Sequence, residues 1–65
     1  MSLVKAIFRG VDKDGNEFVL NHILFDSDLE WVTKQFAEVN KAEVSCFVDD
    51  KKIFVFDFRK VDLMG

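Results

Sequence analysis

The chain has 65 residues, of which 49% are apolar and 32% charged, with three Gly, no Pro and one Cys. This length allows one domain, and the composition excludes a disordered tail, a collagen-like repeat and a flexible linker. The lone Cys favours a reducing, cytoplasmic compartment. The apolar runs are too short for a transmembrane helix or a signal peptide. The net charge of −3 disfavours nucleic acid as a partner, because phosphates attract cationic surfaces.

Residues 3–11 predict a β-strand with one buried face. Their side chains alternate with a period of two, which is typical of a strand that is half-buried in a sheet. The side chains expected on the buried face are those of Val4, Ala6 and Phe8.

Residues 12–16 predict a hairpin turn, in which Gly15 supplies a backbone conformation with positive φ. Residues 17–25 then form the return strand. We expect Val19 and Ile23 to point away from the core. A slip of one residue would bring both inside together with Phe25, because successive side chains of a strand point to opposite faces.

The sequence predicts a capping box that begins at Ser27. The Ser27 hydroxyl can accept a hydrogen bond from the Glu30 amide, and the Glu30 carboxylate can accept one from the Ser27 amide. We expect a helix from this cap to Asn40 or Lys41. At about 100° per residue, the apolar residues form one stripe. This expected buried stripe consists of Leu29, Val32, Phe36 and Val39.

Residues 43–48 and 53–60 predict two further strands, joined by a polar turn at 49–52. In the last strand one face is aromatic and consists of Phe54, Phe56 and Phe58. The predicted order is β-β-α-β-β, an α+β fold in which a four-stranded sheet carries one helix on one face.

The helix and the second hairpin resemble the immunoglobulin-binding domain of protein G, a β-grasp fold. The residues that carry the resemblance are Glu30, Val32, Lys34, Gln35, Phe36, Ala37, Asn40, Asp49 and Asp50. The resemblance implies that strands 3–11 and 53–60 are central and parallel. Thr33 stands where that family has a core Phe, which implies a rotated buried stripe. Cys46 or a neighbour stands where it has an antibody-contacting Trp, so antibody binding is not implied.

Residues 12–16 also match the beginning of an EF-hand calcium loop. However, Glu17 stands where that loop requires Gly, and Ile23 stands where a bidentate Glu closes the site. We therefore expect a hairpin turn here and no calcium ion.

His22 and Cys46 are the only residues of their kinds. A thiol–imidazole pair can make a nucleophile, but both fall in apolar strands and no orienting group accompanies them. Two ligands are too few for structural zinc unless a dimer doubles them. We expect both at the core or its edge, and the slipped register makes His22 a surface residue. The sequence thus predicts no enzyme, no metal and no cofactor.

Trp31 falls outside the expected buried stripe of the helix. Its ring either folds back over the edge of the sheet or anchors a partner, since Trp is enriched among interface hot spots. In the second case the helix carries a protein-binding surface that consists of Trp31, Lys34, Gln35 and Glu38.

The sheet face opposite the helix is expected to be uncovered. Its candidate interface residues are Lys5, Ile7, Arg9, Val19, Ile23, Phe47, Val55, Asp57 and Arg59. A self-complementary dimer, with Arg9 or Arg59 paired to Asp57, is favoured because aliphatic groups bury well. The alternatives are a solvated face or a platform that stacks a nucleic-acid base on Phe47.

We therefore expect a small, non-catalytic, cytoplasmic protein that binds another protein and forms a homodimer, with no membrane contact. The lack of Pro also leaves the edge strands open to pairing with another chain. The alternative function is single-stranded nucleic-acid binding on the open sheet. We expect a phage, prophage or other accessory gene product, an expectation about context that rests on no residue.

Overall fold

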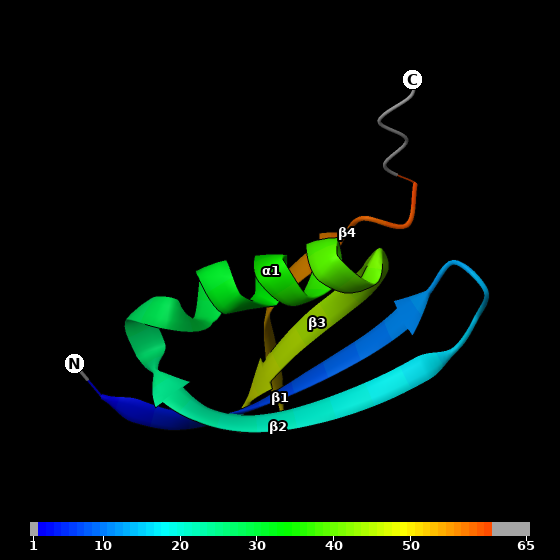
Figure 1. Ribbon diagram of the computed structural model, residues 1–65. Coiled ribbons are helices and arrows are strands. Elements are labelled where there is room, and N and C mark those ends of the chain that lie inside the picture. Colours follow the sequence, from blue (N-terminus) through cyan, green and yellow to red (C-terminus); the bar gives the residue numbers. More distant parts are fainter. Residues whose placement is uncertain (1, 61–65) are drawn as a thin grey trace.

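The computed structural model describes residues 2–60 as a curved four-stranded sheet with a helix on one face (Figure 1). The strands are β1 (Leu3–Asp12), β2 (Glu17–Phe25), β3 (Ala42–Val48) and β4 (Lys51–Asp57). A short 3₁₀ turn, Asp26–Asp28, leads into helix α1 (Leu29–Asn40). The predicted α+β class and the β-β-α-β-β order are confirmed.

The strands lie in the order β2-β1-β3-β4, and every neighbouring pair is antiparallel. The order implied by the resemblance to protein G, with the first and last strands central and parallel, is wrong for this chain. β3 takes the central place beside β1, and its small, completely buried side chains, Ala42, Val44 and Cys46, lie under the helix. β4 is an edge strand, and its inner aromatic side chains are only half-buried.

β2 adopts the first of the two registers that the sequence allowed. Val19 lies opposite Arg9 and Ile23 opposite Lys5, and both apolar side chains are exposed. The alternate β2 side chains Phe18, Leu20 and Leu24 pack against the core.

The hydrophobic core lies between α1 and the inner face of the sheet. Its buried members are Ala6, Phe8, Leu29, Ala37, Ala42, Val44 and Cys46. The aromatic face predicted for the last strand, Phe54, Phe56 and Phe58, packs against this cluster together with Val4. The predicted inner faces of the first and last strands are therefore confirmed.

The buried stripe of α1 differs from the predicted one. Leu29 is buried and Val32 and Phe36 are half-buried, but Val39 is 75% exposed and Thr33 is completely buried. The Thr33 hydroxyl donates a hydrogen bond to the Leu29 carbonyl (2.6 Å), which satisfies the polar atom inside the core. The resemblance to protein G implied a stripe rotated away from Thr33. This implication is wrong, because Thr33 lies at the centre of the buried side.

The beginning of α1 differs in detail from the prediction, whereas its end at Asn40 is as predicted. The N-cap residue is Asp28 rather than Ser27, because the chain first makes the 3₁₀ turn, and the Asp28 side chain makes no capping hydrogen bond. At the other end Lys41 adopts the left-handed conformation (φ 49°) and donates its amide to the Glu38 carbonyl (3.3 Å).

The acidic stretch at residues 12–16 is a hairpin turn, as predicted. The Asp12 carboxylate accepts the amides of Asn16 and Asp14, each at 2.9 Å. These hydrogen bonds, first of all the one from Asn16, lower the pKa of Asp12. Gly15 has a φ of 84°, which an L-residue adopts only with strain.

The second hairpin has a turn of two residues rather than the four expected. Asp49 and Asp50 both have positive φ (53° and 64°), as a tight two-residue hairpin turn requires. β4 consequently begins at Lys51, earlier than predicted. It ends at Asp57 rather than Lys60, and the Phe58 amide makes the last bond to β3, at the Ala42 carbonyl.

Candidate protein-binding surfaces

The outward side of α1 carries the exposed Trp31. Since Leu29, Thr33 and Ala37 face the sheet, a rotation of about 100° per residue places Trp31 on the opposite side of the helix. Trp31 is 64% exposed to solvent. The ring therefore does not fold back onto the sheet, and no packing within residues 2–60 accounts for a tryptophan at this position.

The other predicted residues of this surface follow Trp31 along the outward side of the helix, one and two turns further on. Lys34 and Glu38 are exposed and Gln35 is half-buried. An apolar centre within a polar rim is the usual arrangement of a protein–protein contact. We call Trp31, Lys34, Gln35 and Glu38 the helix surface.

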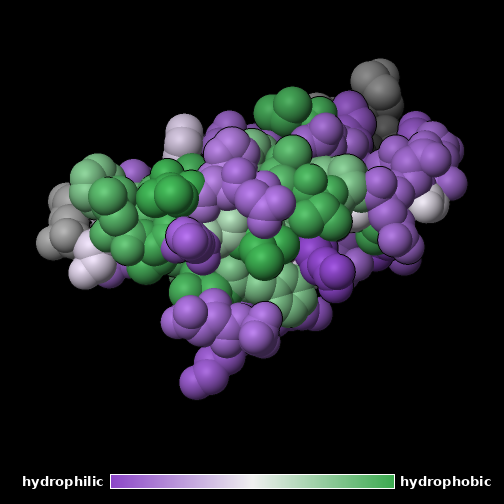
Figure 2. All heavy atoms as spheres, turned by 90° about the horizontal axis from the view of Figure 1, so that it is seen from below, coloured by the Kyte–Doolittle hydropathy of each residue, from purple (hydrophilic) through white to green (hydrophobic). Residues whose placement is uncertain are grey.

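The second candidate surface is the outer face of the sheet, seen in Figure 2 as apolar patches interrupted by charged groups. The predicted residues lie on it, because the strand pairing places Lys5 beside Ile23 and Arg9 between Val19 and Ser45. The candidate interface residues left out two exposed apolar residues of this face, Leu3 and Phe25, which pair with each other at the end of the first hairpin. For Leu3 and Phe25 the period-two pattern already held the signal, since they continue the outward alternation of their strands.

The outer face is hollowed around Phe47. Three shallow depressions, of about 580, 330 and 330 Å³, share Phe47 as a lining residue. The largest lies between Lys5, Ile23 and the turn at Asp49. Such shallow hollows suit protruding side chains of a partner better than an enclosed small molecule.

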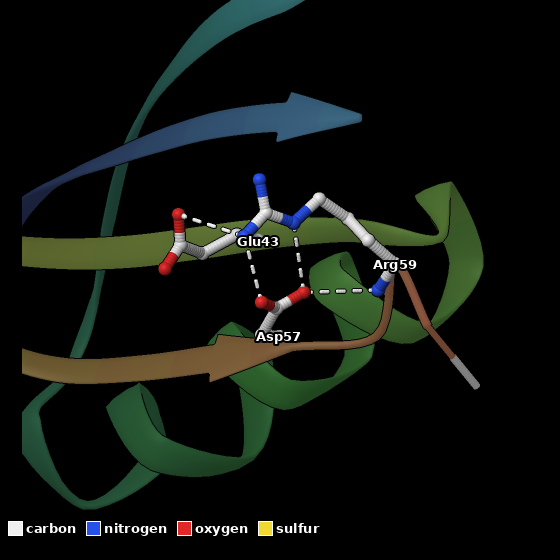
Figure 3. Close-up of polar contacts among 3 residues, drawn as sticks. All are labelled: Glu43, Asp57 and Arg59. Atoms are coloured by element: carbon white, nitrogen blue, oxygen red, sulfur yellow. Dashed lines mark hydrogen bonds and ion pairs between the residues drawn. The ribbon is translucent and has the colours of Figure 1, made fainter. Parts of the chain in front are cut away.

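At one end of the outer face Arg59 is held by two carboxylates (Figure 3). Its Nη2 lies 2.8 Å from Asp57 Oδ2 and 3.6 Å from Glu43 Oε1, and its Nε donates to Asp57 Oδ1 at 3.0 Å. The Arg59 hydrogen bonds lower the pKa of Asp57 to about 2. The expected pairing of Arg59 with Asp57 thus occurs within one chain rather than across a dimer.

Phe47 is likewise engaged within the chain. The Lys52 ammonium lies 5.9 Å from the centroid of the Phe47 ring, a cation–π contact. A nucleic-acid platform needs this ring free for stacking and Arg59 free for phosphate. Both groups already have partners, so the geometry of this face favours the protein interface over the nucleic-acid alternative.

His22 and Cys46 lie in different surroundings. Cys46 is completely buried, and burial raises the pKa of its thiol. His22 is exposed at the margin of the core, with its ring centroid 5.5 Å from that of Phe36 and 6.1 Å from that of Phe8. Their predicted placement, at the core or its edge, is confirmed.

Residues 2–60 contain no group of three or more His, Cys, Asp or Glu side chains that could hold a metal ion. Over the same residues, no helix is long and apolar enough to cross a membrane.

An exposed tryptophan on a helix, over a sheet whose outer face is partly apolar, defines a small α+β protein-binding module. Residues 1–60 match the Dmd family, described as discriminator of mRNA degradation, and the chain belongs to this family. It is 44% identical over 59 residues to antitoxin Dmd of Enterobacteria phage T4. The aligned residues cover 91% of this chain and 98% of that protein.

Two crystal structures contain chains with the same fold. One is the Escherichia coli toxin LsoA in complex with the T4 phage antitoxin Dmd (TM-score 0.86, 44% identity, 88% of this chain and 100% of that chain). The other is Dmd from phage RB69 (TM-score 0.84, 46% identity, 88% and 95%). The relatives are phage proteins, and one is in complex with a protein toxin. The predicted phage context and protein-interaction role agree with them.

Proposed function

We propose that this chain is an antitoxin, which binds a bacterial toxin protein related to LsoA and thereby inhibits it. The observation that carries the proposal is the 44% identity to the T4 antitoxin over nearly the whole of both chains. The TM-score of 0.86 to a chain of the toxin–antitoxin complex supports it. Inhibition of this kind needs a complementary surface and no catalytic group.

The helix surface is the contact that we assign to the toxin. Trp31 offers a large, exposed apolar group on a rigid helix, and such residues lose little conformational entropy on binding. Burial of its ring in a pocket of the toxin is expected to contribute about 2 kcal/mol or more. Lys34 and Glu38, exposed beside it, supply the polar rim.

The charge of the chain complements such a partner. The family description links these proteins to mRNA degradation, and a protein that handles mRNA needs cations for its phosphates. The helix surface is flanked by acidic residues at the start of α1, namely Asp26, Asp28 and Glu30. We therefore expect the toxin to present a basic surface around the pocket that receives Trp31.

Titration calorimetry of the chain against purified LsoA tests the proposal, with rescue of Escherichia coli that expresses the toxin as the functional readout. The Trp31→Ala variant is expected to bind about 30-fold more weakly or worse. Val39→Ala is the matched control, because Val39 is an exposed apolar residue of the same helix outside the helix surface. It is expected to bind within about threefold of the natural chain.

The two parts of the proposal fail separately. If the folded natural chain neither binds LsoA nor rescues growth, the assignment as an antitoxin against this toxin is wrong. If it binds and Trp31→Ala has no larger effect than Val39→Ala, the antitoxin role stands and the helix surface is not the contact.

A further inference from the structure

The two edges of the sheet differ in their protection against pairing with another strand. At the β4 edge stand Lys51 and Lys52, and the pairing of β3 with β4 shifts register between Cys46 and Phe47. Lysine residues and bulges are common devices that block an edge. β2 has none of them: its nine residues include no Lys, Arg or Pro, and its register with β1 is unbroken.

The apolar side chains of β2 are also incompletely covered on both faces. α1 packs mainly on β3 and β4, as Figure 1 shows, with less contact to β1. On the outer face Val19 is 52% and Ile23 65% exposed. On the inner face Phe18, Leu20 and Leu24 remain half-buried. A long, apolar and unguarded edge strand is a site for strand addition.

The backbone hydrogen bonds at both ends of the hairpin show which groups of β2 are free. Asp12 donates its amide to the Asn16 carbonyl, and Asp26 donates to the Ser2 carbonyl. Hydrogen-bonded pairs alternate in an antiparallel ladder. The even-numbered residues of β2 therefore bond to β1, and the amides and carbonyls of Val19, Asn21 and Ile23 point to the open edge.

The sequence of β2 is complementary to itself when two copies are related by a two-fold axis through Asn21. Asn21 then faces Asn21, and Val19 faces Ile23 on the outer side. On the inner side Phe18 faces Leu24, and Leu20 faces His22. Apolar residues thus meet apolar or aromatic ones and no like charges oppose each other.

We propose that the β2 edge pairs with the β2 edge of a second copy of this chain, which joins two sheets into one. About six main-chain hydrogen bonds form through the outward groups of Val19, Asn21 and Ile23. The interface is small, so the dimer depends on concentration. α1 lies over β3 and β4, away from the β2 edge, so the helix surface stays exposed in the dimer. The dimer is therefore compatible with toxin binding and does not depend on it.

Light scattering over a roughly hundredfold dilution series tests the pairing. The mass of the natural chain is expected to double at the highest concentrations. Asn21→Pro removes an outward amide while the bonds to β1 remain, and Ile23→Lys places charge against Val19. Both are expected to be monomeric. Val55→Lys, with the same change at the exposed outer face of the guarded β4 edge, is expected to dimerise normally.

An engineered disulfide tests the register independently of any loss of folding. Residues 21 of the two copies would lie with Cα atoms about 5.5 Å apart, within the range that a disulfide spans. Under mild oxidation Asn21→Cys is expected to form a covalent dimer, whereas Val55→Cys is not. The natural Cys46 is buried, so the natural chain is expected to stay uncrosslinked.

Three results would overturn the proposal. The first is a natural chain that is monomeric at every concentration. The second is a dimer that Val55→Lys breaks and Ile23→Lys spares, which would assign self-association to the outer face. The third is a β2 edge whose amides are protected from exchange only when the toxin is bound, which would assign the edge to the toxin instead.

Discussion

The two sides of the sheet are built differently. Around β3 the helix lies close on small side chains, and Ala42, Val44 and Cys46 are completely buried. At β2, on the far side of β1, the helix gives little cover and no side chain is completely buried. In a chain of this size one helix covers about half of a four-stranded sheet, so the other half either tolerates solvent or finds a partner.

The helix shows the same division across its own width. Its inner side buries a threonine whose hydroxyl is satisfied, and its outer side exposes a tryptophan and a valine. Stability therefore comes from the side that faces β3, and the exposed Trp31 is available for binding.

The largest expected effect on stability comes from Phe8, which is completely buried at the centre of the core. Phe8→Ala is expected to lower the free energy of unfolding by about 3–5 kcal/mol, which is all that such a small core supplies. Ile23→Ala, at an exposed position of β2, is expected to cost less than about 1 kcal/mol. Urea unfolding measures both.

Phe8→Leu keeps the comparison usable if Phe8→Ala does not fold, with an expected loss of about 1–1.5 kcal/mol. Equal losses for Phe8→Leu and Ile23→Ala would show that the covered and uncovered sides of the sheet contribute alike to stability, and the division between them would then be wrong.

An intermediate effect is expected at Gly10, where the hairpin packs on itself. The ring of Phe18 lies over Gly10, and a Cβ added there would fall 2.1 Å from the ring. Gly10→Ala is therefore expected to cost about 1–3 kcal/mol in urea unfolding. In the double variant with Phe18→Leu the clash is relieved and the two losses should not add. Strict additivity would contradict this contact.

The smallest effect is expected at the ion pair of Asp57 and Arg59. The pKa of Asp57 is about 2 because Arg59 hydrogen-bonds to its carboxylate. A depressed pKa means that the pair stabilises the fold above the ordinary value of 3.8 and that this contribution is lost as the pH falls towards 2. The Asp57 carboxyl resonance is expected to titrate near 2, and in Arg59→Gln to return towards 3.8. A midpoint that does not move would show that Arg59 is not the cause.

Much of the fold could be predicted from the sequence, because its signals are local. The alternation in residues 3–11 and 17–25 and the turn at Gly15 indicated the first hairpin and its register. The strand order could not be predicted, because it depends on which strands meet across the helix connection. In the structure β3 lies beside β1, and its small side chains are buried under the helix.

Thr33 and Val39 show where the hydropathy pattern fails. The pattern assigned burial by residue type, so it placed Val39 inside and left Thr33 out. Thr33 is buried because its hydroxyl finds the Leu29 carbonyl within the same helix. For Trp31 the sequence placed the residue outside the buried stripe but left open whether its ring folds back over the sheet, and the structure shows it exposed. The pairing of Arg59 with Asp57 was expected across a dimer, and the sequence held no signal that it forms within one chain. The contact of Lys52 with the Phe47 ring likewise depends on side-chain geometry.

The central claim is that the helix surface, rather than the sheet, receives the toxin. Because the chain contains a single tryptophan, the indole N–H of Trp31 gives one unambiguous resonance in a spectrum of the ¹⁵N-labelled, deuterated protein. On addition of LsoA, we predict that this resonance shifts while the amides of Val55 and Phe47 on the outer face keep their positions. An unchanged indole resonance, with shifts at Val55 and Phe47, would contradict this claim and assign the toxin contact to the sheet.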